Sequence, residues 1–319
     1  MGAGRRPPGA PPPAQRSDED RGQMVKSADA TQTRPVPVTR RADESPVGAD
    51  SFERGGHLVH VDRRLSTVLH RRPAGITGNQ WSSALRTRLD YVVHEAGDGP
   101  ALAGIRFEDP GRREADASRA DRMTGTVCAA AGLGLVRFES AALLPVARRV
   151  VEYVLDARAF HRATAEPAGD TSDGLPGFRD ILGRLPDGRT GHVNDLGALA
   201  RAAAVEAYAS RQLTDPIIRD LHVRWTDGPA EGWAWVEVRP GRSVFERVRV
   251  WQHDFSCGVD PARFAADLAV LAVGERLKQL PTVEPELSAR SDLARELAAL
   301  HRRSGDLAEP FAFAHVTFD

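Results

Sequence analysis

The sequence predicts an α/β domain followed by an α+β domain, with a disordered N-terminal arm ahead of both. Between residues 53 and 163, apolar and β-branched runs alternate with helical patterns in the order strand, strand, strand, helix, strand, helix. Between residues 188 and 285, a helix precedes three closely spaced strands and a further helix. Residues 1–52 contain many Pro and charged residues and almost no large apolar ones, so they cannot offset the entropy of ordering.

The overall composition is that of a globular chain with a disordered part. Of 319 residues, 41% are hydrophobic and 27% charged, and the net charge of −1 gives no overall attraction to nucleic acid or to anionic membranes. No run approaches the ~20 apolar residues of a membrane helix, and no signal peptide is recognisable, so we expect a cytoplasmic protein without membrane contact. Translation from Met24 instead of Met1 stays open. The only cysteines, Cys128 and Cys257, form no CxxC pair, which argues against a disulfide framework or structural zinc.

Arginine carries nearly all of the positive charge, since Lys26 and Lys278 are the only lysines. Phosphate recognition would favour arginine, because its guanidinium binds phosphate through two parallel hydrogen bonds. A GC-rich genome explains the same bias together with the abundant Ala, Gly and Pro, and it is the simpler interpretation.

The first domain, residues 53–163, has a regular order of elements. Leu89–Val93 and residues 101–107 flank a Gly-Asp-Gly-Pro turn and predict a hairpin. The remaining predictions are a strand with a helical turn over 57–69, helices over 114–134 and 142–163, and a strand over 133–140.

A Gly/Pro/Asp-rich stretch, residues 164–187, predicts a linker to the second domain, residues 188–285. There we expect a helix over 193–213, a three-stranded meander between 221 and 255, and a helix capped by Asp260 with Pro261 at its first position. Residues 286–319 add a helix at about 291–302 and a Phe-rich tail. In that tail Phe311, Phe313 and His315 alternate on one face, which fits a strand in this protein, a strand on a partner's sheet edge, or a frayed end.

Charged residues in the two hairpin strands are candidates for a metal-binding or catalytic site. Asp90 lies early in one strand, and Arg106 and Glu108 follow on the next. Residues two apart in a strand share a face, so we expect Arg106 and Glu108 to point the same way, toward the strand of Asp90. Two acids on neighbouring strands can hold a divalent cation that activates water against a phosphate.

The text "LDYVV … ALAGIRFED … SRADRMTGTVCAAAGLGLVRFES" resembles the PD-(D/E)XK restriction-endonuclease-like superfamily, in particular a bacterial branch of small domains. The resemblance covers residues 57–145 and is most specific at Ala129–Phe138, where a helix leads into a strand. It implies a mixed-sheet, restriction-endonuclease-like core for about residues 57–163.

The resemblance also implies roles for the charged residues. Asp90 occupies the first metal-binding acid position, the second acid position is held by Arg106, and the next inward-facing acid is Glu108. The Lys and the His that the branch has nearby are absent here. An arginine beside Asp90 would supply the charge that a metal supplies, so the leading hypothesis is a catalytically degenerate nuclease fold that binds DNA, RNA or protein, with no cofactor.

Two other hypotheses stay open. One is an active nuclease that holds Mg²⁺ or Mn²⁺ with Asp90 and Glu108. The other is a pure interaction scaffold that meets protein partners through the arm or the tail.

Basic residues of the first domain provide candidate contacts to a phosphate backbone. Residues 53–150 contain 15 Arg against 11 Asp and Glu, a difference of +4. This excess is compatible with nucleic acid binding but does not demand it, and an ordinary solvated face is the default interpretation. The candidate substrate-binding residues are Arg106, Arg112, Arg113, Arg119 and Arg122, and Arg63, Arg64, Arg71, Arg72, Arg86 and Arg88 could extend the same face.

The second domain has two weaker candidates. His253, Asp254, Cys257 and Asp260 are residue types that bind metals, but capping by Asp260 and burial of Cys257 explain this stretch more simply. Trp233 and Trp235 share a strand face, where we expect core packing rather than a stacking platform.

Overall fold

A computed structural model describes residues 50–95, 99–112, 117–164, 182–184, 190–192, 196–280, 282 and 285–308. The predicted arm up to residue 49, most of the predicted linker and the tail from residue 309 lie outside the described residues. Within the described part, no helix is long and apolar enough to cross a membrane.

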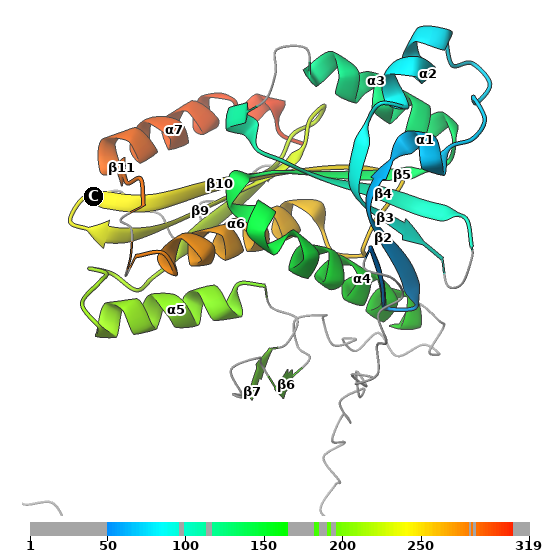
Figure 1. The fold of residues 1–319 in the computed structure, drawn as a ribbon. Helices are drawn as coiled ribbons and strands as arrows, with labels where there is room; N and C mark the ends of the chain where they lie inside the picture. Colours follow the sequence, from blue (N-terminus) through cyan, green and yellow to red (C-terminus); the bar gives the residue numbers. More distant parts are fainter. Residues whose placement is uncertain are drawn as a thin grey trace, which may run out of the picture. The chain divides into compact units, whose positions relative to one another are not determined.

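Nine strands of the described residues form one mixed sheet in the order β1-β2-β3-β4-β5-β10-β9-β8, with β11 pairing β10 (Figure 1). The strands are β1 (Ser51–Arg54), β2 (His57–Arg64), β3 (Arg88–His94), β4 (Ala101–Glu108), β5 (Gly134–Glu139), β8 (Arg219–Arg224), β9 (Ala230–Arg239), β10 (Arg242–His253) and β11 (Ser288–Ala289). A separate hairpin pairs β6 (Leu182–Arg184) with β7 (Thr190–His192). The predicted α/β class is therefore confirmed.

The helices lie on both faces of the sheet. They are α1 (Leu65–Val68), α2 (Gly78–Ala84), α3 (Ala117–Ala130), α4 (Ala147–Thr164), α5 (Ala198–Ala209), α6 (Pro261–Leu277) and α7 (Arg290–Arg302), with short 3₁₀ turns at Pro110–Arg112, Ala141–Val146 and Ser304–Asp306. One face packs against α4 and α6, with α5 on α6, in the main apolar core. On the other face α1–α3 and α7 cover separate ends (Figure 1).

Local sequence patterns predict several of these elements well. The hairpin of β3 and β4 is antiparallel, with Tyr91 opposite Ile105, and β4 runs parallel to β5 after the α3 crossover. The meander of β8, β9 and β10 is also as predicted. The α6 cap is confirmed, since the Arg263 N–H donates to Asp260 Oδ1 at 2.9 Å and Pro261 follows the cap.

The structure also differs from the predicted boundaries. The first strand begins at Ser51, within the predicted arm, and β6 lies within the predicted linker. The two predicted domains share one sheet, because β5 pairs antiparallel with β10. Val136 and Phe138 of β5 point into the main core with Val248 and Val250 of β10, so burial of this common apolar face joins the two halves.

The α6 helix is the centre of the main core. Most of its residues are buried, as expected for a helix enclosed on nearly all sides. It approaches β9 so closely that a Cβ at Gly232 would lie 2.1 Å from the Ala265 carbonyl carbon. Glycine is therefore required at position 232 for the helix to reach the sheet.

Candidate functional site

Asp90, the predicted first metal-binding acid, makes a specific backbone contact. Its Oδ2 accepts a hydrogen bond from the Phe107 N–H at 2.6 Å, just beyond the last paired residues of β3 and β4, Tyr91 and Ile105. Burial raises the pKa of the Asp90 carboxyl above its usual range, while the Phe107 hydrogen bond and the charge of Arg106 oppose this shift. The carboxylate thus holds the end of the hairpin together.

Arg106 and Glu108 share a face of β4, as the sequence predicted. The Arg106 guanidinium lies 3.0 Å from Glu108 Oε1 and 2.8 Å from Asp121 Oδ1, which comes from α3. We expected Arg106 to pair with Asp90, and the recorded ion pairs instead go to Glu108 and Asp121. The reason is that α3 packs over this face and brings a carboxylate that the strand pattern alone did not single out.

Parallel pairing of β4 with β5 places like charges side by side, and Asp121 offsets the two arginines among them. Arg106 lies beside Arg137, and Glu108 lies beside Glu139. Like charges side by side on neighbouring strands are destabilising. Asp121 bridges the two guanidinium groups, since its Oδ2 lies 2.8 Å from Arg137 Nη1.

Arg137 is the most connected of these residues. Its guanidinium also lies 3.1 Å from Glu139 Oε1 and 3.8 Å from Glu108 Oε2. The Trp251 ring lies beneath the guanidinium, 5.0 Å from Arg137 Cζ to the ring centroid, and the indole N–H donates to Glu139 at 3.0 Å. With a side chain only 10% exposed, Arg137 depends on these partners for its charge to be tolerated.

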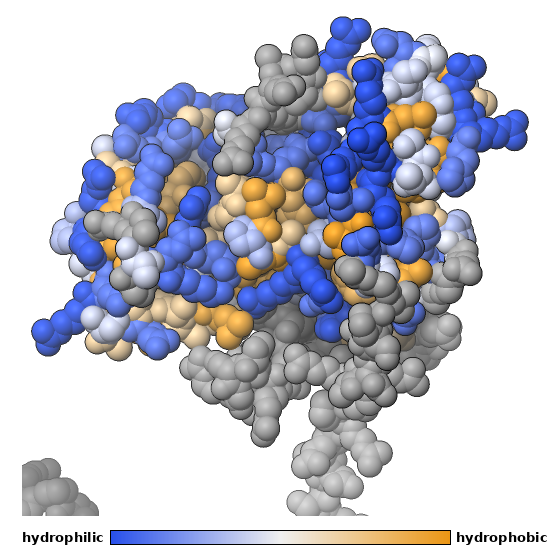
Figure 2. Space-filling model, in the orientation of Figure 1, coloured by the Kyte–Doolittle hydropathy of each residue, from blue (hydrophilic) through white to orange (hydrophobic). Residues whose placement is uncertain are grey.

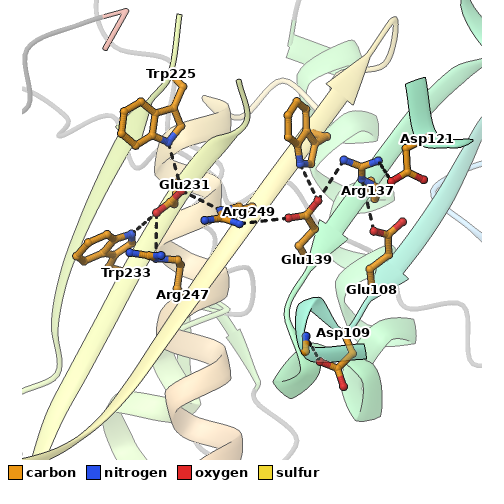
Figure 3. A network of polar contacts seen from close by, with 12 residues as sticks. Glu108, Asp109, Asp121, Arg137, Glu139, Trp225, Glu231, Trp233, Arg247 and Arg249 are labelled. Atoms are coloured by element: carbon orange, nitrogen blue, oxygen red, sulfur yellow. Dashed lines mark hydrogen bonds and ion pairs between the residues drawn. The ribbon is translucent and has the colours of Figure 1, made fainter. Parts of the chain in front are cut away.

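The ion pairs continue across β10 to β9 on the same face of the sheet. Arg249 lies between Glu139, at 3.7 Å, and Glu231, at 3.0 Å. Glu231 also accepts from Trp233 Nε1 at 2.6 Å and faces Arg247 at 3.1 Å. We call this set the charged row, drawn in large part in Figure 3: Arg106, Glu108, Asp121, Arg137, Glu139, Arg249, Glu231 and Arg247.

The charged row balances four arginines against four carboxylates. Asp121, Glu139 and Glu231 are at least 90% buried, so their charges are tolerated because arginines and indole N–H groups surround them. Sequence reasoning missed six members, which were Asp121, Arg137, Glu139, Glu231, Arg247 and Arg249. For four of them the signal was alternation of charged and apolar residues, since Arg137 and Glu139 stand two apart in "LVRFE" and Arg247 and Arg249 stand two apart in "RVRVW".

The chemistry of this donor set fits a divalent metal poorly. Glu108 faces Arg106, and the carboxylate of Asp90 already accepts the Phe107 N–H. A hard cation would have to compete with these guanidinium and amide donors for the same oxygens. Within the described ranges, no group of three or more His, Cys, Asp or Glu side chains is arranged to hold a metal.

The arginines around α1 and α2 have a different environment. Residues 63–88, which we call the basic segment, contain six Arg and no Asp or Glu. Arg64, Arg71, Arg72, Arg86 and Arg88 are exposed, and Arg63 is half-buried. Arg88 pairs with Asp62, just outside the segment. Figure 2 shows hydrophilic side chains around α1 and α2, with paler and hydrophobic ones between them.

A surface depression of about 490 Å³ lies beside this segment. It is lined by His70, Arg71 and Arg72, and by Ala130 and Ala131 from the end of α3. Its lining combines two arginines and a histidine with no carboxylate, which suits an anionic group.

Four other arginines were predicted to contact a substrate, and the structure describes the side chains of two of them. Arg119 and Arg122 are exposed on α3, next to Asp121 of the charged row. The side chains of Arg112 and Arg113 lie outside the described residues.

Of the weaker metal-site candidates in the second half, His253 and Asp254 are exposed, whereas Cys257 and Asp260 have structural roles. Cys257 is buried, and burial raises the pKa of its thiol, while Asp260 caps α6. Trp233 and Trp235 are 1% and 4% exposed and pack under α7, so the core interpretation is confirmed.

Comparison of the chain with protein-family models, with curated proteins and with solved structures finds no match.

Proposed function

We propose that this chain is a non-catalytic protein that binds nucleic acid through the basic segment. The observation that carries the proposal is the run of six arginines without an acid in residues 63–88, five of them exposed. Arginines that face solvent without nearby carboxylates attract phosphate groups, and releasing the counterions of the phosphates drives such binding.

The charged row provides the contrast that supports this assignment. Its arginines are neutralised by carboxylates at 2.8 to 3.8 Å, so they hold the sheet together rather than offer charge to a ligand. Among the residues that the structure describes, the exposed arginines of the basic segment have one acidic ion-pair partner, Asp62 on Arg88.

Absence of catalysis is proposed because of what surrounds the two candidate acids. Asp90 accepts the Phe107 N–H, and Glu108 faces the guanidinium of Arg106 at 3.0 Å. A nuclease that uses two carboxylates needs an oxygen of each directed at a metal, and here the Phe107 N–H and the Arg106 guanidinium compete with a metal for these carboxylates. The resemblance of residues 57–145 to the PD-(D/E)XK superfamily agrees with a fold that has kept one acid position and exchanged the other for arginine.

Fluorescence anisotropy with labelled duplex DNA, single-stranded DNA and RNA tests the binding. Arg71→Glu/Arg72→Glu should weaken binding at least about tenfold at low salt and reduce the slope of log K against log salt by about 2. The matched control is Arg242→Glu/Arg302→Glu, which makes the same change of charge at two exposed arginines outside the segment. Equal losses of affinity in both variants would indicate general electrostatic attraction of nucleic acid to the whole protein. That result would contradict a binding site on the basic segment.

A cleavage assay with Mg²⁺ or Mn²⁺ tests the non-catalytic part. We expect intact substrates with the wild-type chain on all three nucleic acids. Cleavage that disappears in Asp90→Ala would instead establish a nuclease and place Glu108 in its metal site. Absence of any salt-sensitive binding would leave the interaction scaffold as the remaining hypothesis.

A further inference from the structure

The surface depression beside the basic segment has two chemically different sides. The loop that follows α1 contributes His70, Arg71 and Arg72, and the C-terminal end of α3 contributes Ala130 and Ala131. Every residue that lines the depression belongs to the described part of the chain. Because the lining includes no carboxylate, the side of the loop attracts an anion.

The loop that presents these side chains is anchored at both of its ends. Leu65 and Ile76 are buried in one apolar cluster, to which Val127 of α3 also belongs. Between these anchors, Pro73 fixes a backbone torsion angle directly after Arg72. Binding therefore loses less free energy to ordering of the loop than it would in an unanchored segment.

The rest of the lining is apolar. Val68 and Leu69 are half-buried and pack against the same cluster, and Pro73 and Ala74 lie beside them. The volume of about 490 Å³ falls within the range of about 300–1,000 Å³ that is typical of small-molecule sites. The depression therefore suits a unit of the size of one nucleotide, with its phosphate on the arginines and its sugar or base on the apolar lining.

The end of α3 gives such a ligand a direction. The C-terminal end of a helix carries a partial negative charge, because its last carbonyl groups have no partner within the helix. This charge repels a phosphate toward Arg71 and Arg72, whereas the amino groups of a nucleobase can donate to helix-end carbonyl groups. A nucleotide carries an anion and such donors at opposite ends.

We propose that the depression binds a terminal nucleotide with a phosphomonoester, at the end of a nucleic acid strand. This inference rests on the proposed function and deepens it, because Arg71 and Arg72 belong to the basic segment. A phosphomonoester carries a charge of about −1.5 to −2 at pH 7, whereas a phosphodiester within a strand carries one negative charge. Two arginines and a histidine side by side match the higher charge.

Fluorescence anisotropy with three forms of one internally labelled single-stranded DNA tests the site. The first form has a 5′-phosphate, the second has a 3′-phosphate, and the third has hydroxyl groups at both ends. The wild-type chain should bind at least one phosphorylated form at least about fivefold more tightly than the hydroxyl form, because charge-assisted hydrogen bonds to phosphate are the strong ones.

Two substitutions fill the depression without changing the charge of the chain. Ala130→Phe and Ala131→Phe should each abolish the preference for the phosphorylated end and leave the affinity for the hydroxyl form unchanged. The matched control is Ala129→Phe, which places the same side chain on an exposed position of α3 outside the depression. This control should keep the preference.

Equal affinities of the wild type for all three forms would overturn the inference, while the proposed function would stand if Arg71→Glu/Arg72→Glu weakened their binding. A preference that survives in both filling variants would also overturn it, by placing the phosphate outside the depression. Equally tight binding of a phosphoserine peptide would overturn the assignment to a nucleotide. Absence of binding to all three forms would contradict the proposed function as well.

Discussion

Replacement of Arg137 by Met is the sharpest test of the charged row. The change keeps much of the apolar stem and removes the charge that lies 2.8 Å from Asp121, 3.1 Å from Glu139 and 3.8 Å from Glu108. Each carboxylate keeps one other cationic partner, Arg106 for Asp121 and Glu108 and Arg249 for Glu139.

The expected loss follows from this partial compensation. Breaking a buried ion pair by removing one partner costs about 3–5 kcal/mol, and the remaining arginines place Arg137→Met at the lower end, about 3 kcal/mol. For a domain of this size, this corresponds to a fall in Tm of about 6–12 °C. Urea denaturation followed by tryptophan fluorescence measures the free energy of unfolding.

The matched control and a second-site variant complete the experiment. Arg295→Met removes an arginine that is 72% exposed and paired with Asp292, and it should cost under about 0.5 kcal/mol. Asp121→Asn in the Arg137→Met background should restore part of the loss, because it removes one of the carboxylates left without that arginine. A loss in Arg137→Met no greater than in Arg295→Met would refute the view that the row is desolvated.

Three further predictions concern the fold around the site, all measured as free energies of unfolding. Asp90→Ala should cost about 1–3 kcal/mol by leaving the Phe107 N–H unpaired. Asp90→Asn keeps an acceptor and should be at least as stable as the wild type at pH 7, with the gap closing as pH falls through the raised pKa of Asp90. A smaller loss for Ala than for Asn would contradict this role. Gly232→Ala should destabilise strongly because its Cβ meets the Ala265 backbone, and wild-type stability would refute that contact. Burial lowers the pKa of His57, so stability should fall as pH drops below about 6.5. His57→Gln should weaken that dependence, and His60, whose pKa burial also lowers, should retain the rest.

Much of the local structure could be predicted from short-range patterns. Alternation predicted β3, β4 and the shared face of Arg106 and Glu108, because side-chain direction in a strand has a period of two. Asp260 and Pro261 predicted the start of α6, because capping involves only neighbouring residues. The exposed arginines of the basic segment were also visible in the sequence, as a run of positive charge.

The sequence by itself determined the hairpin of β3 and β4, the meander of β8, β9 and β10, the start of α6 and the local concentration of positive charge. Only the tertiary structure decided that β5 pairs with β10, that Asp121 bridges Arg106 and Arg137, and that Asp90 binds the Phe107 N–H. The physical reason is distance along the chain. The contact between Trp251 and Glu139 joins residues 112 positions apart, and packing of the whole apolar core, rather than any local preference, selects such partners.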